Sequence, residues 1–551
     1  MAYVERQRGG RHLVPAETGV DECSGWQPVC RLEEIPDGRG RAVMLKGADV
    51  AVMRSGDAVY AVGGTCPHRG GQIADGTIVG GSVVCPLHLW DFELRTGISP
   101  FNPADRIPTY RARVTTDGVV EVDADSVPRG PGRPDVYLGP WARRGAVDRG
   151  MYVVHHLAEG LKPFVEAMST ERFEPGHDAG RRYASLDDVV FKPAQLARLP
   201  LLDDEPVDTS VVLGTRSAKP LRLAIPLFVS HMSFGALSVE AKVALAKGSR
   251  LAGTAIGSGE GGMHPRERAE AGAYIFEMAS GYFGWTEEAV ARADAIEIKI
   301  GQGAKPGLGG LLPGAKVTGE IAAVRGLPEG IDAHSPSRFP DINSRQDLQR
   351  RMKEIRSITG GAPIGVKFAA GDVEADTAAA LEVGAEWITV DGLGGGTGAA
   401  PVHVKDHVGV PGFVGLYRAK KFLEDHGVDD VQLVATGGFR TPDEMAKALA
   451  LGADAVALAT ASLLAIGCQQ YRACHRGTCP VGIATQEAEL RMRLDPEISA
   501  HRLVTFLVAA TAMITDFCRI TGRHRVGDLC RADLATLRPD VARRTDLEYM
   551  L

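Results

Sequence analysis

Residues 387–398 read Trp-Ile-Thr-Val-Asp-Gly-Leu-Gly-Gly-Gly-Thr-Gly, a short apolar run that passes directly into a glycine-rich loop. An apolar run of this length, bounded by turn residues, is typical of a buried strand in a parallel sheet. Seven further runs of the same kind lie on either side of it, each ending in a polar or glycine-rich loop: Leu223–Ser230, Gly253–Gly257, Ala295–Gln302, Gly330–Pro336, Pro363–Ala370, Val431–Gly438 and Ala455–Ala461.

Helix-like segments separate most of these runs. A buried strand that alternates with an amphipathic helix indicates a parallel βαβ unit, and eight such units predict an α/β fold of the (β/α)8 TIM barrel type. The run Gly253–Gly257 is weak, so seven or nine strands remain open. The segments are Val239–Ala252, Glu287–Ala293, Arg345–Ile358, Val373–Val383, Gly415–Asp425 and Pro442–Leu451.

The loops that follow the runs contain many residues suited to catalysis or ligand binding. In TIM barrels the chemistry lies at the carboxyl ends of the strands, and late glycine loops hold phosphate on backbone N–H groups. A single glycine loop is more often only a tight turn, but several on one face predict a phosphorylated ligand, most simply FMN. The candidates are Ser233, Gly235, Glu260, Lys299, Gln302, Lys305, Lys367, Gly395, Gly396, Thr397, Gly437 and Gly438.

The chain before the barrel has a different pattern. Between residues 22 and 125, short runs such as Ala51–Arg54, Ala58–Val62 and Val119–Val122 alternate with Gly and Asp-Gly breaks. Runs of this length and spacing predict a small antiparallel β domain.

Two loops of this β domain carry paired Cys and His residues. Cys66 and His68 form a C-x-H pair, and Cys85 and His88 form a C-x2-H pair. Two thiolates on one iron and two imidazoles on the other make a Rieske 2Fe–2S centre. A structural zinc site is the alternative, since two Cys and two His also satisfy tetrahedral zinc. Zinc sites usually group like ligands together, whereas here each loop mixes them.

A third cysteine group lies near the end of the barrel, with the spacing C-x5-C-x4-C at Cys468, Cys474 and Cys479. Three thiolates on one loop suit three irons of a cubane that lacks one corner. A zinc loop and three buried thiols are the alternatives.

These motifs resemble two known families. Cys66–Gly71 and Cys85–Trp90 resemble the loops of Rieske ferredoxin-type domains, and Gly71 and Leu87 stand where high-potential members have further cysteines. From about Pro226 to Gln486 the chain resembles the FMN-binding domain of glutamate synthases. The matching stretches include Gly259–Gly262, Gln302–Gly307, Gly395–Ala399 and the Cys-Pro-Val-Gly run at 479–482. In that family the cysteine segment carries a 3Fe–4S cluster.

The resemblance implies an oxidoreductase that acts on CH–NH2 donors. In the direction of synthesis, a 2-oxo acid, by default 2-oxoglutarate, would be aminated by ammonia or an amine with reduced FMN. Lys299, Gln302, Lys305 and Arg325 are the expected carboxylate anchors, and Glu260 the proton-handling group. Taken singly, Lys299 or Arg325 could form only a surface ion pair, but the place of each inside a matched motif favours the functional interpretation. Support of its glycine loop is nearly as good an interpretation of Glu260.

Several departures from the family pattern restrict what is carried over. Position 2 is Ala, and a Rieske domain occupies the end where glutamine-using members have a catalytic cysteine, so free ammonia, an amine or a separate amidotransferase subunit is the expected nitrogen source. No dinucleotide-binding βαβ fingerprint is recognised, so a ferredoxin or a reductase subunit is the expected electron donor. Glu277, Tyr282 and His334–Ile342 also differ. An amine or amino-acid dehydrogenase and a non-catalytic electron-transfer or redox-sensing protein are therefore the alternatives.

Composition and sequence pattern limit the expected partners, location and domains of the protein. The 551 residues carry a net charge of −7, which argues against nucleic acid as a partner. No signal-like segment opens the chain and Leu503–Ile514 is too short to span a bilayer, so we expect a cytoplasmic protein. The expected domains are 22–125 (Rieske), 126–187 (linker and helical lead-in), 188–500 (barrel) and 501–551 (helical tail).

Overall fold

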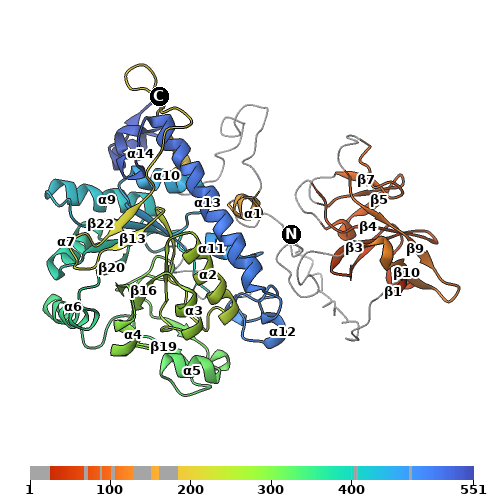
Figure 1. The fold of residues 1–551 in the computed structure, drawn as a ribbon, viewed down its shortest axis with the longest axis horizontal. Helices are drawn as coiled ribbons and strands as arrows, with labels where there is room; N and C mark the ends of the chain where they lie inside the picture. The colour runs from red at the N-terminus through yellow and green to blue at the C-terminus, as the bar shows by residue number, and fades with distance from the viewer. Residues whose placement is uncertain are drawn as a thin grey trace, which may run out of the picture. The chain divides into compact units, whose positions relative to one another are not determined.

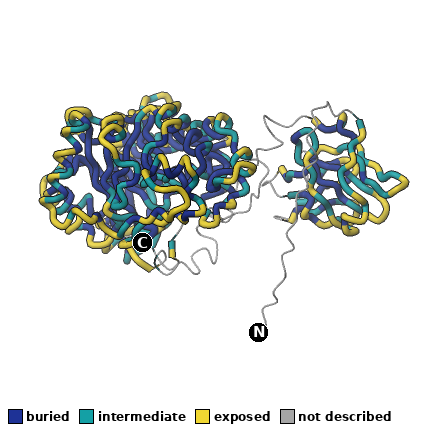
Figure 2. The backbone as a smooth tube through the Cα atoms, turned by 90° about the horizontal axis from the view of Figure 1, so that it is seen from below, coloured by how far each residue is buried: buried dark blue, intermediate teal, exposed yellow. Residues whose placement is uncertain are grey.

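The computed structural model describes residues 25–67, 72–86, 90–100, 106–128, 150–160, 184–398, 400–401, 404, 407–470 and 474–550. The chain divides into two compact units, Met1–Asp135 and Val136–Leu551 (Figure 1). Each unit has its own buried interior (Figure 2).

The first unit is built from three small antiparallel sheets, ordered β1-β10-β9, β2-β3-β4-β8 and β5-β6-β7. The predicted runs Ala51–Arg54, Ala58–Val62 and Val119–Val122 lie inside β3, β4 and β10, so the expected all-β domain is confirmed. The strands are β1 Trp26–Arg31, β2 Gly40–Leu45, β3 Ala48–Ser55, β4 Ala58–Gly63, β5 Thr77–Val79, β6 Ser82–Val84, β7 Asp91–Glu93, β8 Thr109–Tyr110, β9 Ala112–Val114 and β10 Val119–Asp123.

The second unit is a closed parallel barrel, which confirms the predicted (β/α)8 fold (Figure 1). Its strands are almost wholly buried because both faces are covered, by side chains inside and helices outside. In barrel order they are β14 Leu227–Val229, β15 Ala255–Gly257, β16 Ala273–Met278, β17 Ala295–Lys299, β20 Ile364–Ala369, β21 Trp387–Asp391, β22 Gln432–Thr436 and β23 Ala455–Leu458.

Helices follow the barrel strands, and three of those predicted from sequence begin at capping residues. Ser238, Thr286 and Ser344 each accept a hydrogen bond from a backbone N–H in the first turn. The helices are α2 Val239–Leu251, α3 Pro265–Glu270, α4 Glu287–Ala291, α5 Gly319–Arg325, α6 Arg345–Thr359, α7 Val373–Val383, α9 Gly412–Asp425, α10 Pro442–Ala450 and α11 Thr460–Ala465.

One predicted barrel strand is wrong. Gly330–Pro336 contributes only β19 (Ala333–His334), which pairs with β18 (Leu311–Leu312) outside the barrel. The missing strand is β16, whose sequence Ala-Tyr-Ile-Phe-Glu-Met is buried from Tyr274 to Met278. Glu277 interrupts its apolar run, which hid the strand from a search for hydrophobic segments. The weak run Gly253–Gly257 does form a strand, β15, so the count of eight is right.

The amino-terminal end of the barrel is closed by side chains and by a hairpin. Strands β12 (Val211–Leu213) and β13 (Leu221–Leu223) join the same buried cluster as Trp387. A methyl group at Gly365 would lie 2.0 Å from the indole of Trp387, so glycine is what lets this ring fill the interior. With that end packed, the carboxyl end is left for chemistry.

The C-terminal part of the chain packs onto the barrel. Helix α13 (Pro496–Thr521) lies along α2, where Gly248 contacts Leu503. This helix is longer than the predicted apolar stretch and would be long enough to cross a membrane, yet Leu503, Phe506 and Leu507 are fully buried against neighbouring helices. The remaining elements are α1 Met151–Ala158, α12 Ala488–Arg491, α14 Pro539–Thr545 and the sheet of β11 Val189–Phe191, β24 Leu534–Thr536 and β25 Glu548–Tyr549.

Candidate active site at the carboxyl end of the barrel

Charged side chains converge where the barrel strands end. Side chains two residues apart on a strand point to the same side. Glu297 and Lys299 of β17 therefore lie on one side of that strand. Glu277 comes from the neighbouring β16, His231 from just after β14, and Glu260 from the loop after β15. The strands thus bring together residues that are up to 68 positions apart in sequence.

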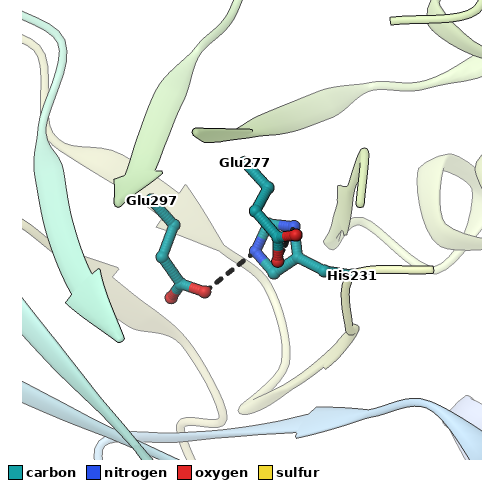
Figure 3. A group of neighbouring side chains, drawn as sticks. All are labelled: His231, Glu277 and Glu297. Atoms are coloured by element: carbon teal, nitrogen blue, oxygen red, sulfur yellow. Dashed lines mark ion pairs between the residues drawn. The ribbon is translucent and has the colours of Figure 1, made fainter. Parts of the chain in front are cut away.

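These five residues form a chain of alternating charges. Lys299 Nζ lies 3.1 Å from Glu260 Oε2 and 2.8 Å from Glu277 Oε1. His231 stands between two carboxylates, with Nδ1 3.6 Å from Glu277 Oε2 and Nε2 3.0 Å from Glu297 Oε2 (Figure 3). The side chain of each of these five residues is at most 12% exposed.

The pKa shifts of this group show how strongly its charges are coupled. Burial alone would lower the pKa of the Lys299 ammonium, but the carboxylates of Glu277 and Glu260 outweigh it and raise that pKa. Burial alone would raise the pKa of Glu277, but Lys299, His231 and Lys367 together lower it to about 2. Lys299 and Glu277 are therefore both charged at neutral pH.

His231, Glu277 and Glu297 also lie close enough together to suggest a metal site. One oxygen of each carboxylate already has another partner, since Lys299 donates to Glu277 Oε1, and Trp387 Nε1 and Thr389 Oγ1 donate to Glu297 Oε1. We therefore interpret the group as an ion chain. Sequence reasoning passed over His231 and Glu297, although Glu297 could have been found from its place two residues before Lys299.

Two cations beside Glu260 lack a carboxylate partner. Lys305 and Arg325 are 8% and 5% exposed, and within the described part of the chain neither forms an ion pair. Arg325 Nη2 donates to the Phe234 carbonyl at 2.8 Å, while its buried Nε has no described partner. Burial lowers the pKa of Lys305, and lowers that of Arg325 to about 10, although Glu260 opposes both shifts. Buried cations of this kind indicate an anion site.

Glu260 faces these cations with a free oxygen. Its Oε2 is held by Lys299, whereas Oε1 is buried and has no hydrogen-bond partner among the described residues. A methyl group at Gly310 would lie 2.8 Å from Oε2, so the next loop packs closely against this carboxylate. Gln302, from the loop after β17, is only half-buried.

The predicted phosphate loops, after β21 and β22, meet each other at the mouth. Gly394, Gly437 and Gly438 all adopt positive φ, and a methyl group at Gly437 would lie 2.7 Å from the backbone N and O of Gly392. Gly396 approaches Thr460, the first residue of α11. This close approach of backbone to backbone fits the glycine-rich cradle of a phosphate group, such as that of FMN.

The other predicted FMN contacts are distributed around the mouth. Lys367 is 5% exposed and lies 3.5 Å from Asp391 Oδ2, and the raised pKa of Lys367, with Asp391 its main cause, keeps it cationic against the effect of burial. Ser233 is half-buried in the loop after β14. Gly235 packs against Leu312, since a methyl group at Gly235 would lie 2.9 Å from that side chain.

The three cysteines of the 468–479 segment lie near one another, although residues 471–473 are outside the described part. Cys474 and Cys479 each raise the pKa of Cys468, which burial brings to about 12.

The cysteine segment is held from outside by two basic residues. His155 Nε2 lies 2.9 Å from the Cys468 carbonyl, and Lys316 Nζ donates to the Cys474 carbonyl at 2.8 Å. Gly398 of the phosphate loop approaches Cys474, since a methyl group there would lie 3.8 Å from its Cβ. The cysteine segment and the phosphate loop are therefore neighbours.

In the first unit, Cys66 follows β4 and Cys85 follows β6, and both are buried in one hydrophobic cluster. The predicted ligands His68 and His88 lie outside the described residues. The structure therefore places one thiol from each predicted ligand loop in the same small core.

Comparison with known proteins agrees with this architecture. Residues 176–524 match the conserved region in glutamate synthase, and residues 25–111 match the Rieske [2Fe-2S] domain. A glutamate synthase large subunit-like protein of Rhizobium meliloti is 40% identical over 67% of this chain and 88% of its own length. The archaeal glutamate synthase [NADPH] of Methanocaldococcus jannaschii is 42% identical over 58% of this chain and 63% of its own length.

Among solved structures, a mandelate oxidase variant bound to (S)-mandelic acid aligns with 64% of this chain and 87% of its own, at 18% identity and a TM-score of 0.42. The chain thus spans most of the rhizobial relative but less than two thirds of the archaeal one. With more than half of its residues inside the matched region, the chain belongs to the glutamate synthase family and carries a Rieske [2Fe-2S] domain at its amino-terminal end.

Proposed function

We propose that the chain is an oxidoreductase that reductively aminates a 2-oxo acid at the mouth of its barrel. One 2-oxo acid, one ammonium ion, two electrons and two protons give one amino acid and one water molecule. Membership of the glutamate synthase family supports the oxidoreductase class, and the names of the relatives make 2-oxoglutarate the reference substrate. Ammonia or a primary amine is the proposed nitrogen source.

The observation that carries this proposal is the pair of buried cations without carboxylate partners, Lys305 and Arg325. A substrate carboxylate between them would satisfy both, and the guanidinium of Arg325 would fix its orientation through paired N–H groups. The free oxygen of Glu260 lies beside them, where it can accept a proton from the incoming nitrogen or return one. Lys299 holds the opposite oxygen of Glu260 and so orients it.

FMN fits the remaining features of the mouth, and when bound it would supply the hydride. The loops Gly394–Thr397 and Gly437–Gly438 would hold its phosphate, and Lys367 would stabilise negative charge on its ring. Cys468, Cys474 and Cys479 would bind a 3Fe–4S cluster beside the phosphate loop. Burial raises the pKa of the Cys468 and Cys474 thiols, so iron that binds them would have to displace their protons.

We further propose that electrons enter from a ferredoxin or a reductase subunit, with the Rieske centre as one carrier. A cytoplasmic location suits clusters that need reduced thiols.

The test is anaerobic photoreduction of the purified protein, followed by ammonia and a panel of 2-oxo acids. Reoxidation of the flavin that needs both reagents, with formation of the amino acid, is the expected result. Reduction of the oxidised flavin by an amino acid alone would favour the dehydrogenase alternative. A flavin that responds to neither would favour an electron-transfer or sensing role.

A further inference from the structure

Lys299 is less available to a substrate than its place in the motif suggested. Its ammonium is bracketed by Glu260 at 3.1 Å and Glu277 at 2.8 Å, and only 11% of its side chain is exposed. An ammonium group has three N–H donors, and two of them already point at carboxylates. A substrate carboxylate that approached Lys299 would also meet the negative charge of both partners.

Glu277 lies closer to Lys299 than to His231. Its Oε1 accepts from Lys299, while its Oε2 lies 3.6 Å from His231 Nδ1. His231 has a closer partner in Glu297, at 3.0 Å. The backbone N–H of Glu277 is held by Ser258 Oγ at 2.9 Å, which fixes the strand beneath the carboxylate.

The two remaining cations, Lys305 and Arg325, lie next to aromatic and small side chains. Arg325 lies over the ring of Phe283, with 5.2 Å between its guanidinium carbon and the ring centre. Ser335 and Gly310 pack around Glu260. Among the described residues, the cations that act on Glu260 are Lys299, Lys305 and Arg325.

We propose that Glu277 makes this site selective for 2-oxo acids that carry a single carboxylate, by occupying the lysine that a second carboxylate would need. Lys305 and Arg325 together bind the carboxylate next to the oxo group. Lys299 is then already paired with Glu260 and Glu277, so a second substrate carboxylate would find no free cation there and would meet their negative charge, whereas an uncharged side chain would fit beside the ring of Phe283 next to Arg325. This inference rests on the proposed function and narrows its substrate class.

The first experiment uses the wild-type protein alone. Photoreduced holoenzyme is mixed anaerobically with ammonia and either 2-oxohexanoate or 2-oxoglutarate, which have similar lengths but differ by one carboxylate. We expect kcat/KM for flavin reoxidation to favour 2-oxohexanoate by at least about tenfold, because like charges brought together in a buried site are strongly disfavoured. Calorimetric binding of each acid to the oxidised protein provides a second readout that needs no turnover.

The second experiment changes Glu277. In Glu277→Gln, Lys299 loses one of its two carboxylate partners. The ratio of 2-oxoglutarate to 2-oxohexanoate, in both kcat/KM and binding, should therefore rise by about 10- to 100-fold. Glu297→Gln is the matched control, since it removes an equally buried carboxylate that contacts His231 and not Lys299. That variant should keep the wild-type ratio between the two acids, whatever its absolute rate.

The outcomes separate this inference from the function on which it rests. If wild-type protein uses 2-oxoglutarate as well as or better than 2-oxohexanoate, the selectivity is overturned while the proposed function stands. If no 2-oxo acid reoxidises the flavin, the function itself fails. If Glu277→Gln and Glu297→Gln shifted the ratio between the two acids equally, the inference would also be overturned. The overall charge of the site, and not the contact between Glu277 and Lys299, would then determine the selectivity. The wild-type comparison remains decisive even if Glu277→Gln does not fold.

Discussion

Lys299 and Lys305 lie six positions apart at the barrel mouth, and their pKa values are shifted in opposite directions. Lys299 has two carboxylate partners and a raised pKa, whereas Lys305 has none and a lowered one. The first is therefore part of the framework, and the second is the group that an anionic ligand would stabilise. Motif spacing treats the two alike, and only their neighbours distinguish them.

The lowered pKa of Lys305 predicts a pH dependence of 2-oxo acid binding. Only the ammonium form attracts a carboxylate, so binding should weaken as pH rises through a Lys305 pKa that lies below the ordinary lysine value. In Lys305→Met, binding at pH 7 should fall by roughly 100-fold, the loss of a charge-assisted contact worth about 3 kcal/mol, and the alkaline limb should disappear.

Calorimetric titration between neutral and alkaline pH measures both effects. Lys219→Met is the control, because Lys219 donates to the Thr359 carbonyl just before β20, at the opposite end of the barrel. An unchanged alkaline limb in Lys305→Met would show that another group binds the carboxylate.

A second prediction concerns the fully buried ion pair between Lys242 on α2 and Glu267 on α3, whose atoms lie 2.6 Å apart. Burial raises the pKa of Glu267 to about 7, even though Lys242 and Tyr274 oppose that shift. Removing the cation in Lys242→Met should cost about 3–5 kcal/mol of unfolding free energy, because a buried carboxylate loses its partner.

The sign of the pH effect follows from the raised pKa. A carboxyl group that binds its proton more tightly in the folded state favours folding at low pH, and this contribution is lost as pH rises through the folded value. Without Lys242 the pKa of Glu267 should rise further, so denaturant unfolding of Lys242→Met should show a deficit against wild type that grows as pH rises above about 7. A deficit independent of pH would mean that lost packing, and not the unpaired charge, is the cause.

At the scale of elements, the contact between α2 and α13 carries much of the packing of the second unit. Helix α13 buries Leu503, Phe506 and Leu507 completely, which accounts for its apolar composition without a bilayer. The two helices approach where Gly248 of α2 meets Leu503, and a methyl group at Gly248 would lie 2.7 Å from Leu503 Cδ2. Glycine is therefore what lets the helices come this close.

This contact predicts a coupled pair of mutations. Overpacking in Gly248→Ala should lower the free energy of unfolding by about 1–3 kcal/mol. The higher helix propensity of alanine should offset roughly 1 kcal/mol of that loss. Leu503→Ala should cost about 2–5 kcal/mol through the cavity it leaves. The double variant should be more stable than the sum of the two losses implies, since each change relieves the other. Urea unfolding of all four proteins measures the coupling, and simple additivity would contradict the contact.

At the scale of the whole molecule, the chain divides into two units, each with its own core and its own group of cysteines. The two cysteine groups are separated by nearly 400 positions in the sequence. We therefore expect each cluster to assemble on its own unit.

Electron paramagnetic resonance of single variants tests this independence. His88→Ala should remove the signal of the reduced Rieske centre and leave that of the oxidised 3Fe–4S cluster, because His88 is an expected ligand only of the first. Cys474→Ser should do the reverse. Iron and sulfide analysis of both variants checks that the remaining cluster is fully loaded. Loss of both signals from either change would show that the clusters do not assemble separately.

Much of the architecture was accessible from sequence, and the errors have physical causes. The barrel and its strand count were predicted, but β16 was overlooked because Glu277 breaks its apolar run. At the mouth, Glu260, Lys299, Lys305 and Arg325 were found through their motifs and do converge. His231 was not singled out, because its partners lie 46 and 66 positions away on β16 and β17.

The sequence by itself determined which segments become buried strands, which loops follow them, and which cysteines are spaced as cluster ligands. Those properties depend on the local order of apolar, glycine and ligand residues, which a linear pattern records. Only the tertiary structure decided that Lys299 is occupied by two carboxylates while Lys305 and Arg325 have none. The charge state and availability of a buried group depend on which neighbours the closing barrel brings within a few ångströms, and that is a property of strand register in three dimensions.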